Sequence, residues 1–204
     1  MNHPPFGFGI AGTGMIAGVI ADALEKSTEA RLAAVSSRRL DKAQEFVKSR
    51  RGTAAVEGVD QLIAREDVEA VYIATPTVAK EAIAKAAMAA GKHILIDKPF
   101  TSAASVERMI TTAAARNLMF MDATHFVHHP RTAAIRQGAA RAIGLPRSLH
   151  TSFYSPLADR NNIRFNPDQE PMTALGDMGW YSLRAVVEYL RPEGKIGAFV
   201  ESSG

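Results

Sequence analysis

The stretch that decides the fold runs from residue 6 to residue 17 and reads FGFGIAGTGMIA. Residues 6–11 form an uncharged apolar run typical of a buried strand, and helical spacing follows over residues 15–25. The turn between them fits G-x-G-x-x-A. In that pattern the first glycine permits the tight turn, the second lets the backbone approach a pyrophosphate, and the small third residue lets helix and strand pack closely. We expect dinucleotide contacts from Gly12, Thr13, Gly14, Met15 and Ile16.

The strand-then-helix pattern repeats downstream of this turn. Further strands are expected at residues 31–37, 68–74, 93–96 and 118–121, and further helices at 41–50, 79–90 and 102–116. Ser102 is the expected N-cap of the last helix. Strands alternating with helices at this spacing imply right-handed crossovers and a parallel sheet covered on both faces. The sequence therefore predicts an α/β fold, a Rossmann doubly wound parallel sheet, and argues against a purely structural glycine turn.

The composition of the sequence changes after Asp122, where His125, His128, His129 and Arg131 lie close together in the chain. We therefore place a domain boundary near residue 123. Residues 1–123 are the expected NAD(P)-binding Rossmann domain, and residues 124–204 the expected partial C-terminal α+β domain for substrate binding or oligomerisation. In this second part we expect helices at 131–143 and 173–190, a strand at 147–156, an irregular polar loop at 157–172, and a last strand from Ile196.

Composition excludes several classes of chemistry. The 204 residues are 47% hydrophobic and 22% charged, and they contain no cysteine, which rules out disulfides, thiolate metal sites and a Cys nucleophile. The net charge of +3 is spread along the chain, so nucleic-acid binding is not expected. Neither a signal sequence nor a membrane-spanning run is recognisable, which leads us to expect a cytoplasmic protein.

The end of the second strand predicts which cofactor binds. An NAD site usually places Asp or Glu about 20 residues beyond the glycines to accept from the ribose 2′-hydroxyl. This chain instead has Ser36, Ser37, Arg38 and Arg39. Hydroxyl and guanidinium groups donate to a 2′-phosphate, which a carboxylate would repel. NADP is therefore favoured, and NAD is the alternative. The competing interpretation is that both arginines simply begin a solvated surface helix.

A lysine follows the strand at 93–96 and is the first candidate catalytic residue. Asp97-Lys98-Pro99 stands at the carboxyl end of a parallel strand, where open α/β sheets bind ligands. From there the Lys98 ammonium can point toward a nicotinamide and hydrogen-bond to the oxygen of an alcohol being oxidised. It would stabilise developing alkoxide charge and assist proton movement.

Three motifs together resemble one enzyme family. Residues 9–17, 71–76 and 91–99, in that order, are similar to the glucose-fructose oxidoreductase, inositol dehydrogenase and MocA-like (Gfo/Idh/MocA) oxidoreductases, and the resemblance spans nearly all of residues 6–122. Lys98 matches the family's catalytic lysine, and Asp97 replaces its usual Glu. The resemblance extends the expected cofactor contacts to Thr75, Pro76, Asp97 and Lys98. Where the family commonly has Asn and His after Pro76, this chain has Thr77 and Lys80, to which no role is transferred.

The resemblance continues over residues 175–181, which are similar to the family's Asp-x-Gly-x-His or Asp-x-Gly-x-Tyr helix. A spacing of four places Asp177 and Tyr181 on one helical face. The family match implies that Tyr181 relays the proton while Asp177 orients the substrate or its neighbours. The alternative is that Tyr181 is a core tyrosine whose hydroxyl is satisfied.

Further substrate contacts are expected from less specific signals. His125, His128 and His129 lack the spacing of a helical metal pair, so no metal is expected and structural roles are favoured for them. Substrate-side candidates are His125, Arg131, Arg160 and Asn161, with Arg164 beside them.

The resemblance implies an NADP-dependent oxidoreductase that transfers hydride between nicotinamide and a sugar, polyol or diol-like substrate. Asp-x-Gly-x-Tyr and Ser-Ser-Arg look most like the NADP-linked xylose and dihydrodiol dehydrogenases. The alternative is a non-catalytic NADP-binding protein, either a redox sensor or a truncated, inactive relative. Members of the family carry a larger second domain than residues 124–204 provide, so we expect a truncated product or completion by a partner, with a homo-oligomer as the favoured assembly.

Overall fold

The computed structural model describes residues 4–194, 196, 197 and 199, and its internal contacts divide the chain into two compact units. Unit 1 consists of residues 1–123 and 159–173, and unit 2 of residues 124–158 and 174–204. The predicted domain division at residue 123 remains a proposal. By contacts, however, the segment 159–173 groups with unit 1, whereas the sequence pattern had placed it in the second domain.

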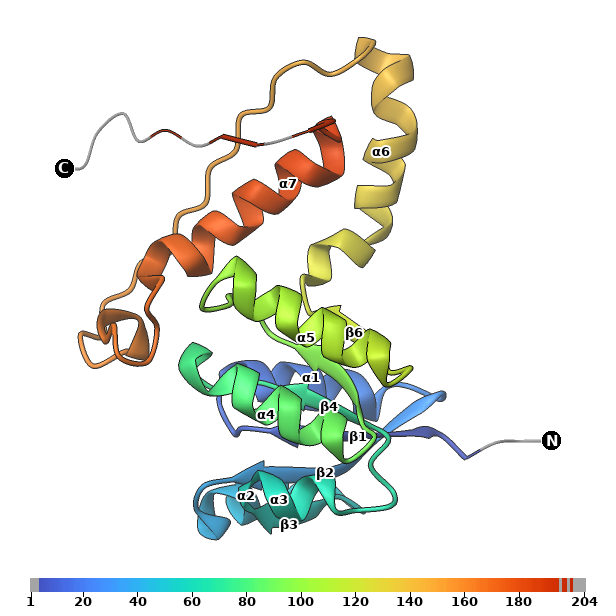
Figure 1. The fold of residues 1–204 in the computed structure, drawn as a ribbon, viewed down its shortest axis with the longest axis vertical. Coiled ribbons are helices and arrows are strands. Elements are labelled where there is room, and N and C mark those ends of the chain that lie inside the picture. Colours follow the sequence, from blue (N-terminus) through green and yellow to red (C-terminus); the bar gives the residue numbers. More distant parts are fainter. Residues whose placement is uncertain (1–3, 195, 198, 200–204) are drawn as a thin grey trace. The chain divides into compact units, whose positions relative to one another are not determined.

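Unit 1 contains a six-stranded parallel sheet in the order β3-β2-β1-β4-β5-β6 (Figure 1). The strands are β1 (Phe6–Ala11), β2 (Ala30–Ser37), β3 (Ala54–Glu57), β4 (Ala70–Ile73), β5 (His93–Ile96) and β6 (Phe120–Asp122). This is the doubly wound Rossmann order, in which the winding direction reverses between β1 and β4. The predicted fold class is confirmed.

Helices cover both faces of this sheet. They are α1 (Met15–Glu25), α2 (Leu40–Val47), α3 (Gly58–Ile63), α4 (Thr77–Ala89) and α5 (Ala103–Ala115). On one face, Ala17 and Ala21 of α1 pack in a buried cluster with Ile10, Val35 and Tyr72, and side chains of α2 pack against that cluster. On the other face α4 contacts both α3 and α5. Ser102 caps α5 as predicted, its hydroxyl accepting from the Ser105 N–H at 3.1 Å.

Two elements of unit 1 are not predicted by the sequence pattern. The strand β3 and the helix α3 have four and six residues, too few for a clear period of either kind. The bounds of four further elements also differ from the prediction by a few residues. The helix α2 ends at Val47 rather than residue 50, α4 begins at Thr77 rather than residue 79, β4 spans only residues 70–73, and β6 spans 120–122.

The regular elements that the structure describes in unit 2 are all helices. A 3-10 helix η1 (His125–His128) leads into α6 (Pro130–Ile143), and a π-helical turn η3 (Leu175–Gly179) leads into α7 (Trp180–Leu190). The expected strand at 147–156 is wrong: those residues are irregular and, except for Leu149, not even partly buried, because an apolar alternation forms a strand only where a neighbouring strand pairs with it. Residues 196, 197 and 199 are not in a strand, and the rest of the expected last strand lies outside the described residues.

Among the described residues, every helix falls short of the length and hydropathy needed to cross a bilayer.

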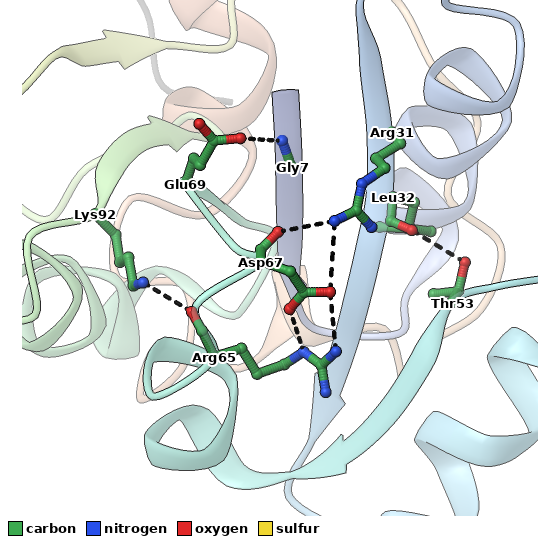
Figure 2. Close-up of polar contacts among 8 residues, drawn as sticks. All are labelled: Gly7, Arg31, Leu32, Thr53, Arg65, Asp67, Glu69 and Lys92. Carbon is green, nitrogen blue, oxygen red and sulfur yellow. Dashed lines mark hydrogen bonds and ion pairs between the residues drawn. The ribbon is translucent and has the colours of Figure 1, made fainter. Parts of the chain in front are cut away.

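The amino-terminal edge of the sheet is held by paired polar groups, shown in Figure 2. The Glu69 carboxylate accepts from the Gly7 N–H at 2.7 Å, and Lys92 Nζ donates to the Arg65 carbonyl at 2.8 Å. Arg65 makes a two-pronged contact with Asp67 at 2.8 and 3.0 Å, and this guanidinium holds the pKa of the Asp67 carboxyl below its ordinary value. These contacts tie strand starts to loops, so this edge contributes stability.

Candidate cofactor and active site

The opposite, carboxyl-terminal edge of the sheet collects most of the predicted site residues. Ala11 of β1 pairs with Ser36 of β2 and with Ile73 of β4, and Ile73 pairs in turn with Ile96 of β5. The residues that follow these four therefore lie along one edge of unit 1. They are the glycine turn from Gly12, the segment Ser37–Arg39, the pair Thr75–Pro76, and Asp97–Lys98. Ligands bind at this edge in open α/β sheets, beside the point where strand order reverses.

The glycine turn is built by backbone requirements. Gly12 has φ +117°, and a Cβ there would lie 2.6 Å from the Ala74 carbonyl oxygen, so only glycine fits. Its N–H donates to the Ser36 carbonyl at 2.9 Å. Gly14 is the N-cap of α1 and has extended backbone, and a Cβ there would meet nothing within 4 Å. The structure thus assigns a packing role to the first glycine and leaves open space at the second.

The start of α1 suits a phosphate. Within the described residues, no side chain caps this helix and its first turn has no acidic residue, so its N-terminal N–H groups are available to an anion. Met15 is 77% exposed beside the turn, whereas Ala17 is fully buried against the sheet. Thr13 lies between the two glycines. These features fit the pyrophosphate of a dinucleotide.

A buried hydroxyl stands on the other side of the strand-order reversal. Thr75 Oγ1 is buried and has no hydrogen-bond partner in the part of the chain that the structure describes. An unsatisfied buried polar atom costs about 1–3 kcal/mol, which a ligand that hydrogen-bonds to it would recover. Pro76 follows and is the N-cap of α4. The residues at this edge therefore fit a bound dinucleotide on two independent grounds.

The segment proposed to select NADP is partly committed to internal contacts. Ser36 is buried, and the Ser37 hydroxyl accepts from the Arg39 N–H at 3.5 Å. The Arg39 guanidinium pairs with Asp41 in the first turn of α2; this hydrogen bond raises the pKa of Arg39 and lowers that of Asp41. Arg38 is exposed and makes no ion pair among the described residues. Arg38 is thus the more available of the two guanidinium groups.

Lys98 occupies a buried position just past β5. The Asp97 N–H donates to the Ile73 carbonyl at 3.0 Å, which extends the sheet to the start of this loop. Lys98 itself is 8% exposed. The ammonium of Lys80 donates to the carbonyl of Lys98 at 3.0 Å and to that of Pro99 at 2.9 Å. No role was transferred to Lys80 from the family resemblance, because the chain departs from the family's pattern there; the fold brings α4 beside this loop.

In unit 2 the structure surrounds Tyr181 with aromatic rings. Phe153 stacks on it at 5.2 Å with 13° between the planes, His125 meets it edge-on at 5.8 Å, and Phe126 lies at 6.1 Å. Tyr181 stands in the first turn of α7. No sequence pattern indicates a role for Phe153, since residues 147–156 are expected from the sequence to form a strand.

The helix that carries Tyr181 is irregular at its start. Asp177 lies in the π-helical turn η3, so its relation to Tyr181 is not that of a regular α-helix. Trp180 Nε1 donates to Thr124 Oγ1 at 2.8 Å and fixes the start of α7 within unit 2. Single π turns in helices occur frequently at functional sites.

The weaker substrate candidates are divided between the units. Arg131 is exposed at the start of α6, and its N–H donates to His129 Nδ1 at 3.0 Å, so His129 caps this helix. Arg160 and Asn161 belong to residues 159–173, the second segment of unit 1. The Arg160 guanidinium lies over the Phe165 ring at 5.2 Å.

Asn161 and Arg164 make local contacts within the same segment, residues 159–173. The Asn161 N–H donates to Asp159 Oδ1 at 2.9 Å, and Arg164 contacts the Asn162 side chain at 3.3 Å. Across the described residues, no cluster of three or more His, Asp or Glu side chains could hold a metal ion.

Comparison with known proteins places this geometry among oxidoreductases. Over residues 6–124 the chain matches the oxidoreductase family with an NAD-binding Rossmann fold. It is 35% identical over 192 residues to a dTDP-3,4-didehydro-2,6-dideoxy-alpha-D-glucose 3-reductase from Actinomadura kijaniata, a match covering 93% of this chain and 57% of that relative. It is 30% identical over 206 residues to the scyllo-inositol 2-dehydrogenase (NADP(+)) IolU of Bacillus subtilis, covering 97% and 62%.

A solved structure is similar over most of the chain. The crystal structure of KijD10, a 3-ketoreductase from Actinomadura kijaniata in complex with NADP and TDP-benzene, matches with a TM-score of 0.86 and 35% identity. The match covers 91% of this chain and 57% of that one. The chain thus spans little more than half the length of these relatives, 57% and 62% for the two curated ones.

Proposed function

Because the chain belongs to the oxidoreductase family with an NAD-binding Rossmann fold, we propose that it is an NADP-dependent oxidoreductase acting on a sugar, polyol or diol-like substrate. The observation that carries the proposal is the shared edge of unit 1, where the glycine turn and Lys98 follow strands in register. A dinucleotide site and a buried lysine at one sheet edge would bring the cofactor and a hydrogen-bond donor for the substrate oxygen to the same edge of the sheet.

The cofactor is NADP in this proposal, with NAD as the weaker alternative. Gly12, Thr13, Gly14, Met15 and Ile16 would hold the pyrophosphate at the N-terminus of α1. The 2′-phosphate would be bound by donors that the chain offers at the end of β2: Ser36, Ser37, Arg38 and Arg39. Thr75, Pro76, Asp97 and Lys98 complete the proposed cofactor contacts. The bound NADP of KijD10 supports this assignment.

The catalytic roles are assigned to side chains of this chain. When bound, the nicotinamide ring supplies the chemistry of accepting or giving the hydride. Lys98 donates a hydrogen bond to the substrate oxygen and stabilises negative charge that develops there. The proton relay is assigned to Tyr181 and the orientation of the substrate to Asp177, the roles that the family resemblance implies.

The substrate class rests on what the relatives act on, by their names a dTDP-keto-sugar and scyllo-inositol. Both are rings bearing several oxygens. His125, Arg131, Arg160 and Asn161 are the proposed donors to such oxygens. We further propose that the protein acts in the cytoplasm as a homo-oligomer, without binding nucleic acid or membranes.

The test is a substrate screen that follows NADPH absorbance with nucleotide-activated keto-sugars, aldoses, inositols and cyclic diols. Tyr181→Phe should keep the ring stack with Phe153 and lower kcat roughly 100-fold or more, the usual contribution of general acid–base catalysis. Lys98→Ala should lower kcat similarly. Tyr154→Phe, at a 91% exposed tyrosine of the same unit, is the matched control and should not change kcat.

The same screen separates the proposal from its alternative. Tight NADPH binding with no turnover on any of these substrates would favour a non-catalytic NADP-binding protein. Full activity in Tyr181→Phe would dismiss the tyrosine as the proton relay while leaving the cofactor assignment in place.

A further inference from the structure

A buried network of charged groups lies behind the Lys98 loop, entirely within unit 1. Glu170 accepts from the Thr77 N–H at 3.0 Å and from the Thr77 hydroxyl at 2.5 Å. Lys80 Nζ donates to Thr77 Oγ1 at 3.3 Å and to the carbonyls of Lys98 and Pro99 at 3.0 and 2.9 Å. The network therefore joins three segments that are distant in sequence: the start of α4, the loop after β5, and residues 159–173.

The donors and acceptors of this network are paired with one another, and its opposite charges are linked. Lys80 is 3% exposed and Glu170 is 8% exposed, so both charges are removed from water. An ammonium group has three donor hydrogens, and three oxygens accept from Lys80 here. The Thr77 hydroxyl donates to the carboxylate while it accepts from the ammonium, and so links the two opposite charges. Buried charges persist only where partners of this kind compensate them.

Glu170 also completes the N-terminus of α4. The N-cap residue Pro76 has no side-chain cap to offer, and the first N–H groups of a helix need acceptors. The Glu170 carboxylate supplies one for Thr77, and the Gln169 carbonyl accepts from the Val78 N–H at 3.4 Å. A negative charge at this end is also favoured by the helix dipole. The segment 159–173 is thereby fastened to the helix start.

Lys80 contacts Lys98 through the main chain of Lys98. Lys80 binds the main-chain carbonyls of Lys98 and of the next residue, so it fixes the backbone from which the Lys98 side chain projects. A lysine side chain has four rotatable bonds, and its ammonium is placed well only if its backbone is rigid.

We propose that Thr77, Lys80 and Glu170 form a clamp that positions Lys98 for catalysis and holds the segment 159–173 on unit 1. These are positioning residues, since they act through the Lys98 backbone. The inference rests on the proposed function for the role of Lys98, whereas the existence of the clamp does not. The clamp also brings the proposed substrate contacts Arg160 and Asn161 under the control of the same network.

The test uses the full chain and matched variants of α4. Lys80→Met removes the ammonium while keeping length, and Thr77→Val removes the hydroxyl at similar volume. Thr77→Ser restores the hydroxyl and serves as the rescue. Lys85→Met removes an exposed ammonium that pairs with Glu81 on the same helix and serves as the control. If Lys80→Met does not fold, Thr77→Val and its rescue carry the same comparison.

Two measurements are made on each variant. Hydrogen exchange followed by mass spectrometry should be faster over residues 97–101 and 159–173 in Lys80→Met and Thr77→Val, and unchanged there in Lys85→Met and Thr77→Ser. The kcat should fall roughly 10- to 100-fold, the loss that a misplacement of about 1 Å can produce, while NADPH affinity is kept. In a Lys98→Ala background, Lys80→Met should lower kcat by no more than about twofold, the limit of additivity errors.

The exchange and kinetic measurements test the clamp and the positioning of Lys98 separately. Unchanged exchange in both segments, or faster exchange throughout unit 1, would overturn the clamp. A full additional loss of kcat in the Lys98→Ala background would overturn the positioning of Lys98, even with faster local exchange. If the unaltered chain turns over no substrate, the proposed function fails, and the exchange data alone still support or refute the clamp.

Discussion

Arg38 is the residue through which the chain should distinguish NADP from NAD. It is exposed at the end of β2, while its neighbour Arg39 is already paired with Asp41. Arg38→Ala should raise the Kd for NADPH about 10- to 100-fold, because a hydrogen bond to a charged group is worth about 1.5–3 kcal/mol. The Kd for NADH should not change. Fluorescence titration of both cofactors measures this.

The matched control for Arg38 is Arg51→Ala, which removes an exposed guanidinium elsewhere on unit 1. It should leave both dissociation constants unaltered. Equal losses of NADPH and NADH affinity in Arg38→Ala would mean that this side chain does not contact the 2′-phosphate.

At this scale the sequence predicts residues whose role depends on their neighbours in the chain. Gly12 and Gly14 are recognisable because the turn, the strand before it and the helix after it are contiguous. Lys80 and Glu170 are not, because Glu170 contacts a residue 93 positions away and no local pattern marks that contact. A lysine on an Ala-rich helix ordinarily signals an exposed face, and only the fold shows this one to be buried.

Among the elements, the β1–α1 turn separates two uses of glycine. Gly12→Ala would bring a Cβ within 2.6 Å of the Ala74 carbonyl oxygen at a φ of +117°, and should lower the free energy of unfolding by about 1–3 kcal/mol. Gly14→Ala meets no neighbour within 4 Å and should cost about 1 kcal/mol or less as an N-cap change. Urea titrations measure both.

The order of the two variants should be reversed when NADPH affinity is measured on the folded protein: Gly14→Ala should lower the affinity more than Gly12→Ala does. A methyl group at Gly14 stands where the backbone must approach the pyrophosphate, so Gly14→Ala should weaken binding roughly tenfold or more. Normal NADPH affinity in Gly14→Ala would refute the assignment of this glycine to the cofactor.

The helices α4 and α5 are joined by a carboxylate whose charge makes stability depend on pH. Glu81 accepts from Arg108 at 2.8 Å, from Ser105 at 2.6 Å, and pairs with Lys85 at 2.8 Å. The Arg108 guanidinium, then Lys85 and Ser105, hold the pKa of Glu81 far below its ordinary 4.5. The unfolded chain therefore binds a proton first as the pH falls, and the stabilisation, complete well above pH 4.5, is lost progressively below it.

Glu81→Gln should accordingly lower the Tm at neutral pH, and the difference from the unaltered protein should shrink as the pH is lowered below about 4.5. Glu107→Gln, at an exposed position of α5 with no ion pair among the described residues, is the control and should leave the Tm nearly constant. A difference for Glu81→Gln that stays constant down to low pH would contradict the charged role of this side chain.

Element prediction from sequence succeeded where the hydrophobic period was long enough to detect. The helix α1 has the predicted bounds, 11 residues from Met15 to Glu25. The strand β3 has four partly buried or exposed residues and leaves little signal. The strand expected at 147–156 fails for the converse reason, since its pattern carries no information on whether a partner strand exists.

For the whole molecule, the proposed homo-oligomer can be tested at exposed apolar side chains of unit 2. Leu183 and Val187, four residues apart on α7, are 56% and 46% exposed. Contiguous exposed apolar surface marks interaction sites, so the double variant Leu183→Gln, Val187→Gln should shift sedimentation velocity profiles toward smaller species. Ile110→Gln, at a 51% exposed position of α5 in unit 1, is the control. Identical profiles for all three proteins would exclude α7 from the proposed oligomer contact.

The course of the chain between the units has a consequence for protein engineering. The polypeptide leaves unit 1 after residue 123, returns for residues 159–173, and leaves again. A chimera joined at residue 123 would exchange the segment that holds Glu170 and so remove the partner of Thr77. Successful recombination with a related enzyme should therefore transfer two pieces together, and the residues facing each other across that contact should have changed in concert during evolution.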